Sequence, residues 1–242
     1  MRLLVCATAV LALGGLAVPA QAAATKVVFG YAWADGRTGL RLTPATATYR
    51  KPLHKLTAVR DAKELRLDYG QASYRRVTVA CDLKETEGKV AIDRNGLGTT
   101  PCKTGDLTET LAEGPSAVRV EYSGGKAVKV SEILSTWPDA VTARGTIRRA
   151  GDSTVLFTTG GRTVKLGYTH AATFSRTTAR CSDSWLAGKP VNVDKRGLGK
   201  KACSAADLAQ VLKTAGHPVL AQIEYVPGVG EINQVWEVYG TA

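Results

Sequence analysis

The stretch AIDRNGLG at residues 91–98 recurs as NVDKRGLG at residues 192–199. Beyond each copy the chain reaches a cysteine, Cys102 or Cys203, and then an Asp-Leu pair, at a constant offset of 101 residues. The match continues upstream to Cys81 and Cys181, and the order and spacing hold over about 60 residues. A repeat of this length indicates that one small domain has been duplicated in tandem.

The repeat also predicts how the cysteines pair. Four cysteines permit three pairings, and only Cys81–Cys102 with Cys181–Cys203 gives each copy an equivalent bridge. Each bridge closes a loop of roughly 20 residues, for which the chain-entropy account gives about 3 kcal/mol of stabilisation. We therefore expect one structural disulfide in each domain.

The fifth cysteine, Cys6, lies in an N-terminal leader. Residues 1–22 combine a basic start, an uncharged apolar stretch and the small-residue pattern Ala20-Gln21-Ala22, which is typical of a secretory signal peptide. We expect a secreted, extracellular protein with a first repeat domain at residues 23–135 and a second at residues 139–242. The formal charge of +11 falls to +10 after cleavage because the leader carries Arg2 and no acidic residue. This balance favours acidic partners.

Each copy is expected to be an α+β domain, strand-rich, with an antiparallel sheet, one main helix and one disulfide. Asp35-Gly36 and the turn at residues 150–153 are hairpin signals between strand-like runs. Helices are predicted at Thr104–Ala112 and after the capping residue Ser204, and two strands follow each helix. The alternating residues 90–93 and 191–194 are interpreted as half-buried strands.

The sequence displays no constellation of residues that suits catalysis. The three histidines do not pair with a cysteine or with one another at metal-ligand spacing. Gly151-Asp152-Ser153 falls in a predicted hairpin turn, where these residue types are favoured, and no base accompanies the serine. We predict a non-enzyme with no catalytic residues, no metal and no cofactor.

The two copies differ most in surface charge. The second Gly-Leu-Gly loop carries four cations where the first has only Arg94, and Trp185 has no counterpart in the first copy. A cationic loop fixed by a disulfide would lose little entropy on binding, although a solvated loop explains the same charges. The candidate partner-binding residues are Lys195, Arg196, Lys200, Lys201 and Trp185.

The copies also differ in length. Thr43–Leu65 of the first copy has no counterpart in the second, where the equivalent stretch is compressed to Gly160-Gly161-Arg162. This segment is either a binding arm or a disordered loop.

In its organisation the chain resembles the adaptor subunits of the secreted umbrella toxin particles of Gram-positive soil bacteria. The resemblance covers secretion, size and the absence of a catalytic constellation, and it rests on no signature motif. In such particles a small adaptor joins a lectin-bearing subunit to a repeat on the toxin-bearing filament. The resemblance implies a two-domain adaptor that links protein partners in an extracellular assembly.

Other functions fit the same sequence. An extracellular protease inhibitor would present Lys195 or Arg196 on an exposed rigid loop to a trypsin-like enzyme. A cell-wall or polysaccharide binder would use the positive charge against an anionic polymer. We expect a secreted protein partner with an acidic surface or an anionic wall polymer, and we expect neither a membrane span nor a nucleic-acid partner.

Overall fold

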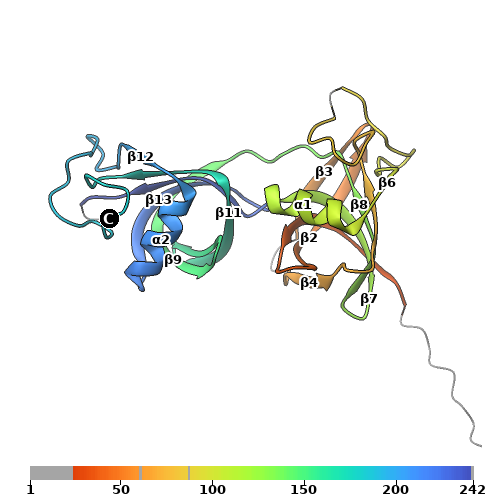
Figure 1. Cartoon of the computed structure of the whole chain (residues 1–242), viewed down its shortest axis with the longest axis horizontal. Coiled ribbons are helices and arrows are strands. Elements are labelled where there is room, and N and C mark those ends of the chain that lie inside the picture. Colours follow the sequence, from red (N-terminus) through yellow and green to blue (C-terminus); the bar gives the residue numbers. More distant parts are fainter. Residues whose placement is uncertain (1–23, 60–61, 87, 241–242) are drawn as a thin grey trace, which may run out of the picture.

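The computed structural model describes residues 24–59, 62–86 and 88–240. Figure 1 shows two strand-rich domains side by side, joined by a single extended linker. The signal-peptide prediction lies outside the described residues. The expected α+β architecture of two strand-rich domains, with one main helix and one disulfide each, is confirmed.

The second domain is a closed five-stranded barrel. Its β9 pairs with β10, β10 with β11, β11 with β14, β14 with β13, and β13 again with β9. Only the β11–β14 pairing is parallel, so the sheet is mainly antiparallel as expected. The elements are β9 (Val141–Gly151), β10 (Thr154–Thr159), β11 (Arg162–Arg176), β12 (Lys201–Cys203), α2 (Ala205–Ala215), β13 (Val219–Val226) and β14 (Glu231–Glu237).

The first domain repeats this arrangement, with β4 and β5 together taking the place of the long β11. It adds one strand, β3, beside an extended β2. The elements are β1 (Lys26–Ala34), β2 (Gly39–Arg50), β3 (Leu53–Ala58), β4 (Leu65–Asp68), β5 (Ser73–Arg76), β6 (Thr100–Cys102), α1 (Thr104–Glu113), β7 (Ser116–Ser123) and β8 (Lys126–Glu132).

Both domains therefore share the connectivity of the OB-fold, a five-stranded Greek-key barrel with a helix between the third and fourth strands. Such barrels often bind ligands on strands 2 and 3 and on the loops 1–2 and 4–5. The fold alone does not assign a function, because function depends on the groups that each barrel presents.

The second helix starts at the cap that the sequence predicts. In α2, Ser204 Oγ accepts a hydrogen bond from the Asp207 amide at 3.2 Å, and the Asp207 carboxylate accepts one from the Ser204 amide at 2.8 Å. The helix ends at Gly216, whose positive φ of 67° suits glycine. Its buried face carries Leu208, Val211 and Leu212, as predicted, and it packs against a core of side chains from the barrel strands.

The prediction of strands at residues 90–93 and 191–194 is wrong. These segments make only isolated bridges, Ile92 with Gly98 and Val193 with Gly199. Each bridge closes a tight turn in the loop instead of joining the barrel. The alternating polarity does not correspond to an inward side, because Val90 and Val191 are exposed.

The longer segment of the first copy forms a β-hairpin. Thr43–Arg50 continues β2, and β3 pairs with it from Arg50↔Leu53 to Ala45↔Ala58. The hairpin folds over the outside of the first barrel, where Ala45, Ala47 and Leu56 pack with Phe29 and Tyr31 of β1. The part of the segment that the structure describes is thus mostly ordered strand.

The two barrels are docked against each other. Val226 and Val229, at the β13–β14 turn, join a buried cluster with Tyr31, Leu56 and Ala117 of the first domain. Trp33 Nε1 donates a hydrogen bond to the Val229 carbonyl oxygen at 2.9 Å. The sheet does not continue through Trp137, which packs edge-on against Tyr31 with its side chain half exposed.

An ion pair across this contact should respond to pH. Glu64 accepts hydrogen bonds from Lys165 of the second barrel at 2.9 Å and from Arg41 at 3.4 Å. Partial burial alone would raise the pKa of Glu64, but the two cations outweigh it and lower the pKa below its ordinary value.

Because the folded-state pKa is depressed, this contribution is present above the ordinary Glu range of about pH 4 and is lost as the pH falls through the folded-state value. We expect Glu64→Gln to abolish this acid-dependent loss of stability, which solvent screening limits to less than about 1 kcal/mol. Urea unfolding between pH 7 and pH 3, with Glu109→Gln as an exposed control, measures it. An unchanged pH dependence in Glu64→Gln would contradict the prediction.

Candidate functional site

A buried arginine–glutamate pair supports the disulfide-closed loop of each barrel. In the first barrel, Arg76 Nε lies 3.2 Å from Glu132 Oε1, and Arg76 Nη1 donates to the carbonyl oxygens of Cys81 and Leu83 at 2.6 and 2.8 Å. Tyr74 also donates its hydroxyl to Glu132. Burial, reinforced by the Glu132 charge, raises the pKa of Tyr74 and keeps this donor protonated.

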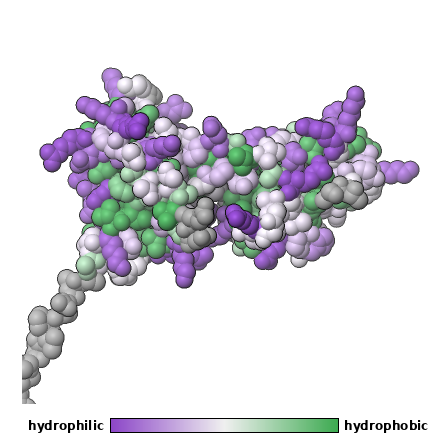
Figure 2. All heavy atoms as spheres, turned by 180° about the vertical axis from the view of Figure 1, so that it is seen from behind, coloured by the Kyte–Doolittle hydropathy of each residue, from purple (hydrophilic) through white to green (hydrophobic). Residues whose placement is uncertain are grey.

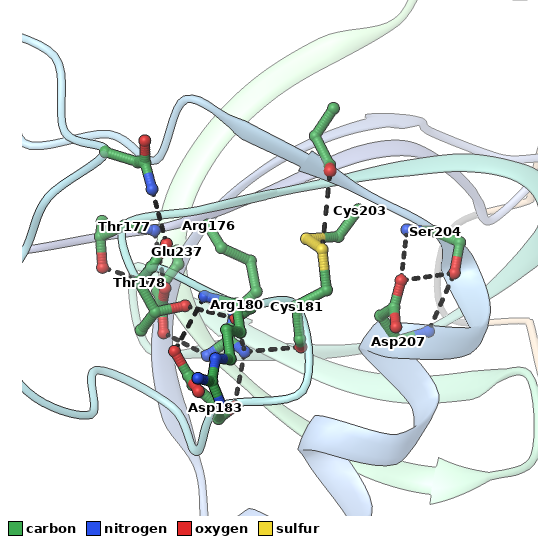
Figure 3. The surroundings of a disulfide bond; sticks show 12 residues. Arg176, Thr177, Thr178, Arg180, Cys181, Asp183, Cys203, Ser204, Asp207 and Glu237 are labelled. Carbon is green, nitrogen blue, oxygen red and sulfur yellow. Dashed lines mark hydrogen bonds and ion pairs between the residues drawn. A yellow bond between two sulfur atoms is a disulfide. The ribbon is translucent and has the colours of Figure 1, made fainter.

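The second barrel has the same device in a fully buried form. Arg176 Nη2 lies 3.0 Å from Glu237 Oε1, and neither side chain is exposed. Figure 3 shows Arg176 reaching from its strand into the loop next to the Cys181–Cys203 bridge. Its guanidinium donates to four loop carbonyl oxygens, those of Arg180, Cys181, Asp183 and Ser184. The loop is therefore fixed by a covalent bridge at one point and by a buried cation at another.

Both disulfides have the predicted pairing, Cys81–Cys102 and Cys181–Cys203, with sequence separations of 21 and 22 residues. Each cysteine pair lies close to the first-turn aspartate of the following helix, Asp106 or Asp207. Sulfur that is bonded to sulfur cannot act as a thiolate ligand, so these clusters are structural. Among the residues that the structure describes, no other histidine, cysteine and carboxylate group lies at metal-binding distances.

The Gly-Leu-Gly turn of the second barrel presents its cations at a fixed tip. Asp194 Oδ1 accepts hydrogen bonds from the amides of Arg196 and Leu198, both at 2.8 Å. The bond from the Leu198 amide is the main reason that the pKa of Asp194 lies below its ordinary value. Gly197 has φ of 79°, and a Cβ there would lie 2.3 Å from the Tyr239 carbonyl oxygen. Only glycine fits this turn without strain.

The structure brings the predicted basic residues to one end of the second barrel. Lys195 and Arg196 are exposed at the tip of the turn, Lys200 is exposed at its base, and Lys201 is half buried in β12. Figure 1 places the loops around β12 at the end of this barrel farthest from the first domain. Figure 2 shows hydrophilic side chains projecting from that end as well. Whether these cations bind a partner stays a prediction.

Trp185 lies against the barrel. Its ring stacks on Phe174 with centroids 5.6 Å apart, and its Nε1 is buried without a hydrogen-bond partner in the described chain. Arg176 lies over the Phe174 ring, with its guanidinium carbon 5.4 Å from the ring centroid. The geometry gives Trp185 a role in packing the loop, and a direct contact with a partner stays a prediction.

Three further residues of this surface were not identified from the sequence. Arg144 of β9 is exposed and donates to the Arg196 carbonyl oxygen at 3.4 Å. The Tyr239 amide donates to the Gly197 carbonyl oxygen at 2.8 Å, and its side chain is half exposed. Trp236 faces outward on β14, between the core residues Val235 and Glu237, and is only partly buried. Side chains alternate between the two faces of a strand, so the position of Trp236 next to Val235 could have placed it on the outer face of β14.

The same positions of the first barrel carry different side chains. Register in the last two strands makes Ser131 the counterpart of Trp236 and Arg119 the counterpart of Gln222. The β2–β3 hairpin packs on the outer surface of the first barrel, whereas the second barrel has a two-residue turn at Gly160-Gly161 in its place. The two barrels thus share their buried support and differ in what they present outward.

His54 and the Gly-Asp-Ser tripeptide both have surroundings that explain them without catalysis. His54 is buried and its Nε2 lies 3.0 Å from the Asn95 carbonyl oxygen. Ser153 is exposed in the β9–β10 turn, and the neighbouring Asp152 pairs with Arg149 at 2.5 Å. No described histidine or carboxylate hydrogen-bonds to Ser153, so the turn offers the serine no base.

In comparisons with protein-family models, curated proteins and solved structures, nothing matches this chain. None of the helices in the described part of the chain is long and apolar enough to cross a membrane. The site itself must therefore carry any functional argument.

Proposed function

We propose that this protein is a secreted, non-catalytic adaptor that binds an acidic surface of an extracellular protein partner through the second barrel. The binding surface is the basic tip: Lys195, Arg196, Arg144 and Tyr239. The observation that supports it most is the fixed cationic turn, which the first barrel repeats in shape but not in charge. The Asp93 turn has the same carboxylate-to-amide bonds and carries only Arg94.

The composition of the tip suits protein recognition. Arginine and tyrosine are enriched among residues that dominate binding energy, and complementary charge speeds association. The tip loses little conformational entropy on binding because a disulfide, a buried cation and a carboxylate already hold it. Docking between the barrels also occupies the region around β11 and the β13–β14 turn of the second barrel, where OB-folds often bind ligands. A partner therefore has the far end of this barrel available to it.

An assembly role fits the two-domain layout. The first barrel binds the second through its outer surface and leaves the basic tip at the opposite end of the molecule. We propose that the protein links partners in an extracellular complex, and a toxin particle is one such complex. The turn is less suited to a protease inhibitor. The Gly197 amide donates to the Asp194 carbonyl oxygen at 3.0 Å, so the backbone here is a tight turn. A protease cleft binds an extended segment instead.

The test is affinity purification of the tagged, secreted protein from native culture supernatant, with mass spectrometry of what co-purifies. We expect a defined secreted protein at a stable ratio, and we expect Lys195→Glu with Arg196→Glu to reduce its recovery on the order of tenfold or more. The matched control is Arg94→Glu with Asn95→Glu in the equivalent turn of the first barrel.

Equal recovery with both double variants would contradict the assignment of the tip. If the protein is recovered without a partner and sediments with cell-wall material in a salt-sensitive way, the adaptor function is contradicted and a wall binder is favoured. A protein that comes back alone and inhibits a trypsin-like protease would favour the inhibitor.

A further inference from the structure

The β2–β3 hairpin of the first barrel borders an open cavity that the proposed function does not use. The cavity measures about 480 Å³ and lies between the hairpin, the Gly-Leu-Gly loop and the outer surface of β7 and β8. This volume lies within the range of about 300–1,000 Å³ that is common for small-molecule sites. We propose that it binds a small organic carboxylate with an apolar ring or stem.

Backbone hydrogen bonds hold the hairpin in place beside this cavity. His54 of β3 donates its amide to the Leu134 carbonyl oxygen at 2.7 Å and accepts at its own carbonyl from the Thr136 amide at 3.0 Å. Tyr49 and His54 close on Gly96, where a Cβ would lie 2.4 Å from the Tyr49 ring. The absence of a side chain at Gly96 therefore allows the hairpin to pack on the loop and to leave the cavity beside it.

Two residues that line the cavity, Tyr49 and His54, each carry a buried polar atom without a hydrogen-bond partner in the described chain. His54 is 3% exposed, and because its Nε2 lies against a carbonyl oxygen, Nε2 carries the proton and Nδ1 is an acceptor. That Nδ1 and the Tyr49 hydroxyl are both buried without a hydrogen-bond partner in the described chain. A buried polar group without a partner costs on the order of 1–3 kcal/mol. The Tyr49 hydroxyl can donate a hydrogen bond to a carboxylate, whereas Nδ1 is an acceptor that a carboxylate does not satisfy.

The charge of the lining determines the class of ligand. Arg119 is paired with Glu121, whereas Lys129, half buried on β8, makes no ion pair or hydrogen bond within the described chain. The lining therefore carries one net positive charge. Phe29, Ala47 and Leu97 supply the apolar part of the surface. A carboxylate can pair with Lys129 while its apolar body lies against these three side chains.

The second barrel does not share this site. It has no counterpart of the β2–β3 hairpin, and Gln234 and Gln222 stand at the positions of Lys129 and Arg119. The cavity is thus a property of the first domain alone. Its occupation and the binding of a partner at the basic tip can be tested separately.

Benzoate is a suitable probe, with benzamide as its neutral counterpart. Added to the isotope-labelled, full secreted protein, benzoate should shift the amide resonances of Gly96, Leu97 and Lys129 saturably, with a Kd on the order of 1 mM for a nine-atom fragment. We expect benzamide to bind at least fivefold more weakly. Lys129→Gln should weaken benzoate binding to the same degree, with Lys126→Gln at the exposed start of β8 as the control.

A second variant tests the cavity independently of charge. Ala47→Leu should fill the space and abolish the shifts, while the other resonances show that the barrel remains folded. The proposal is overturned if benzoate causes no saturable shift, if benzamide binds equally well, if Lys129→Gln leaves the affinity unchanged, or if the shifts lie at residues 195–201 instead of the cavity.

Discussion

Replacing Arg176 with methionine is expected to lower the free energy of unfolding of the second barrel by about 3–5 kcal/mol. The substitution leaves the Glu237 carboxylate fully buried and without its counter-ion. It also removes the donor of four hydrogen bonds to loop carbonyl oxygens. Glu237 would keep its bonds from the Thr177 and Leu186 amides, at 2.8 and 2.6 Å, but these cannot neutralise the charge.

Urea unfolding gives the size of this loss, and amide hydrogen exchange assigns it to the second barrel. The exposed Arg180→Met is the matched control and should change the stability by less than about 0.5 kcal/mol. The double variant Arg176→Met with Glu237→Met should recover part of the loss, because it removes the buried charge as well. A loss below about 1 kcal/mol in the single variant would show that water or a shifted side chain satisfies Glu237.

The internal repeat predicted much of the fold because equivalent residues constrain each other. It identified the pairing of Cys81 with Cys102 and of Cys181 with Cys203. Both helices and the hairpin turns were predicted from local patterns of a few residues. Closure of the barrels was not predicted, since it depends on the parallel pairing of β11 with β14 across a helix and two strands. Local polarity contains no information about such a distant partner.

The buried arginine–glutamate pairs escaped prediction for a different reason. A charged residue in a strand is normally interpreted as exposed, because burial of a lone charge is costly. The signal was nevertheless present in the repeat. Arg76 and Arg176 stand five residues before Cys81 and Cys181, and Glu132 and Glu237 stand near the ends of the last strands. Opposite charges that are duplicated in two otherwise apolar regions indicate a buried pair.

The candidate site was predicted only in part. Lys195 and Arg196 could be identified because they break the symmetry between the copies. Tyr239 and Arg144 could not, because they reach the turn through the Gly197 carbonyl and the Arg196 carbonyl, contacts that the fold creates. Thr43–Leu65 was difficult because Pro44 and the Lys51-Pro52 pair suggest a loop, whereas most of the described segment is a hairpin that borders an open cavity.

Removing the second disulfide, by Cys181→Ala with Cys203→Ala, is expected to lower the free energy of unfolding by about 3 kcal/mol. Cys81→Ala with Cys102→Ala should cost nearly the same, because the two loops differ by only one residue in sequence separation. Binding should separate the two variants: only loss of the second bridge frees the loop that carries Lys195 and Arg196, and so only that variant should weaken recovery of the partner.

The second bridge and Arg176 hold the same loop, so their effects should not add. Without the bridge, the hydrogen bonds of Arg176 must order a freer loop, and each of them contributes less to stability. We expect the triple variant, with Arg176→Met added, to lose less than the sum of the separate losses by at least about 0.5 kcal/mol. Urea unfolding of the four proteins in this cycle measures the difference. Strict additivity would mean that the bridge and the buried cation support different parts of the loop, and the fixed basic tip would then depend on the Asp194 turn alone.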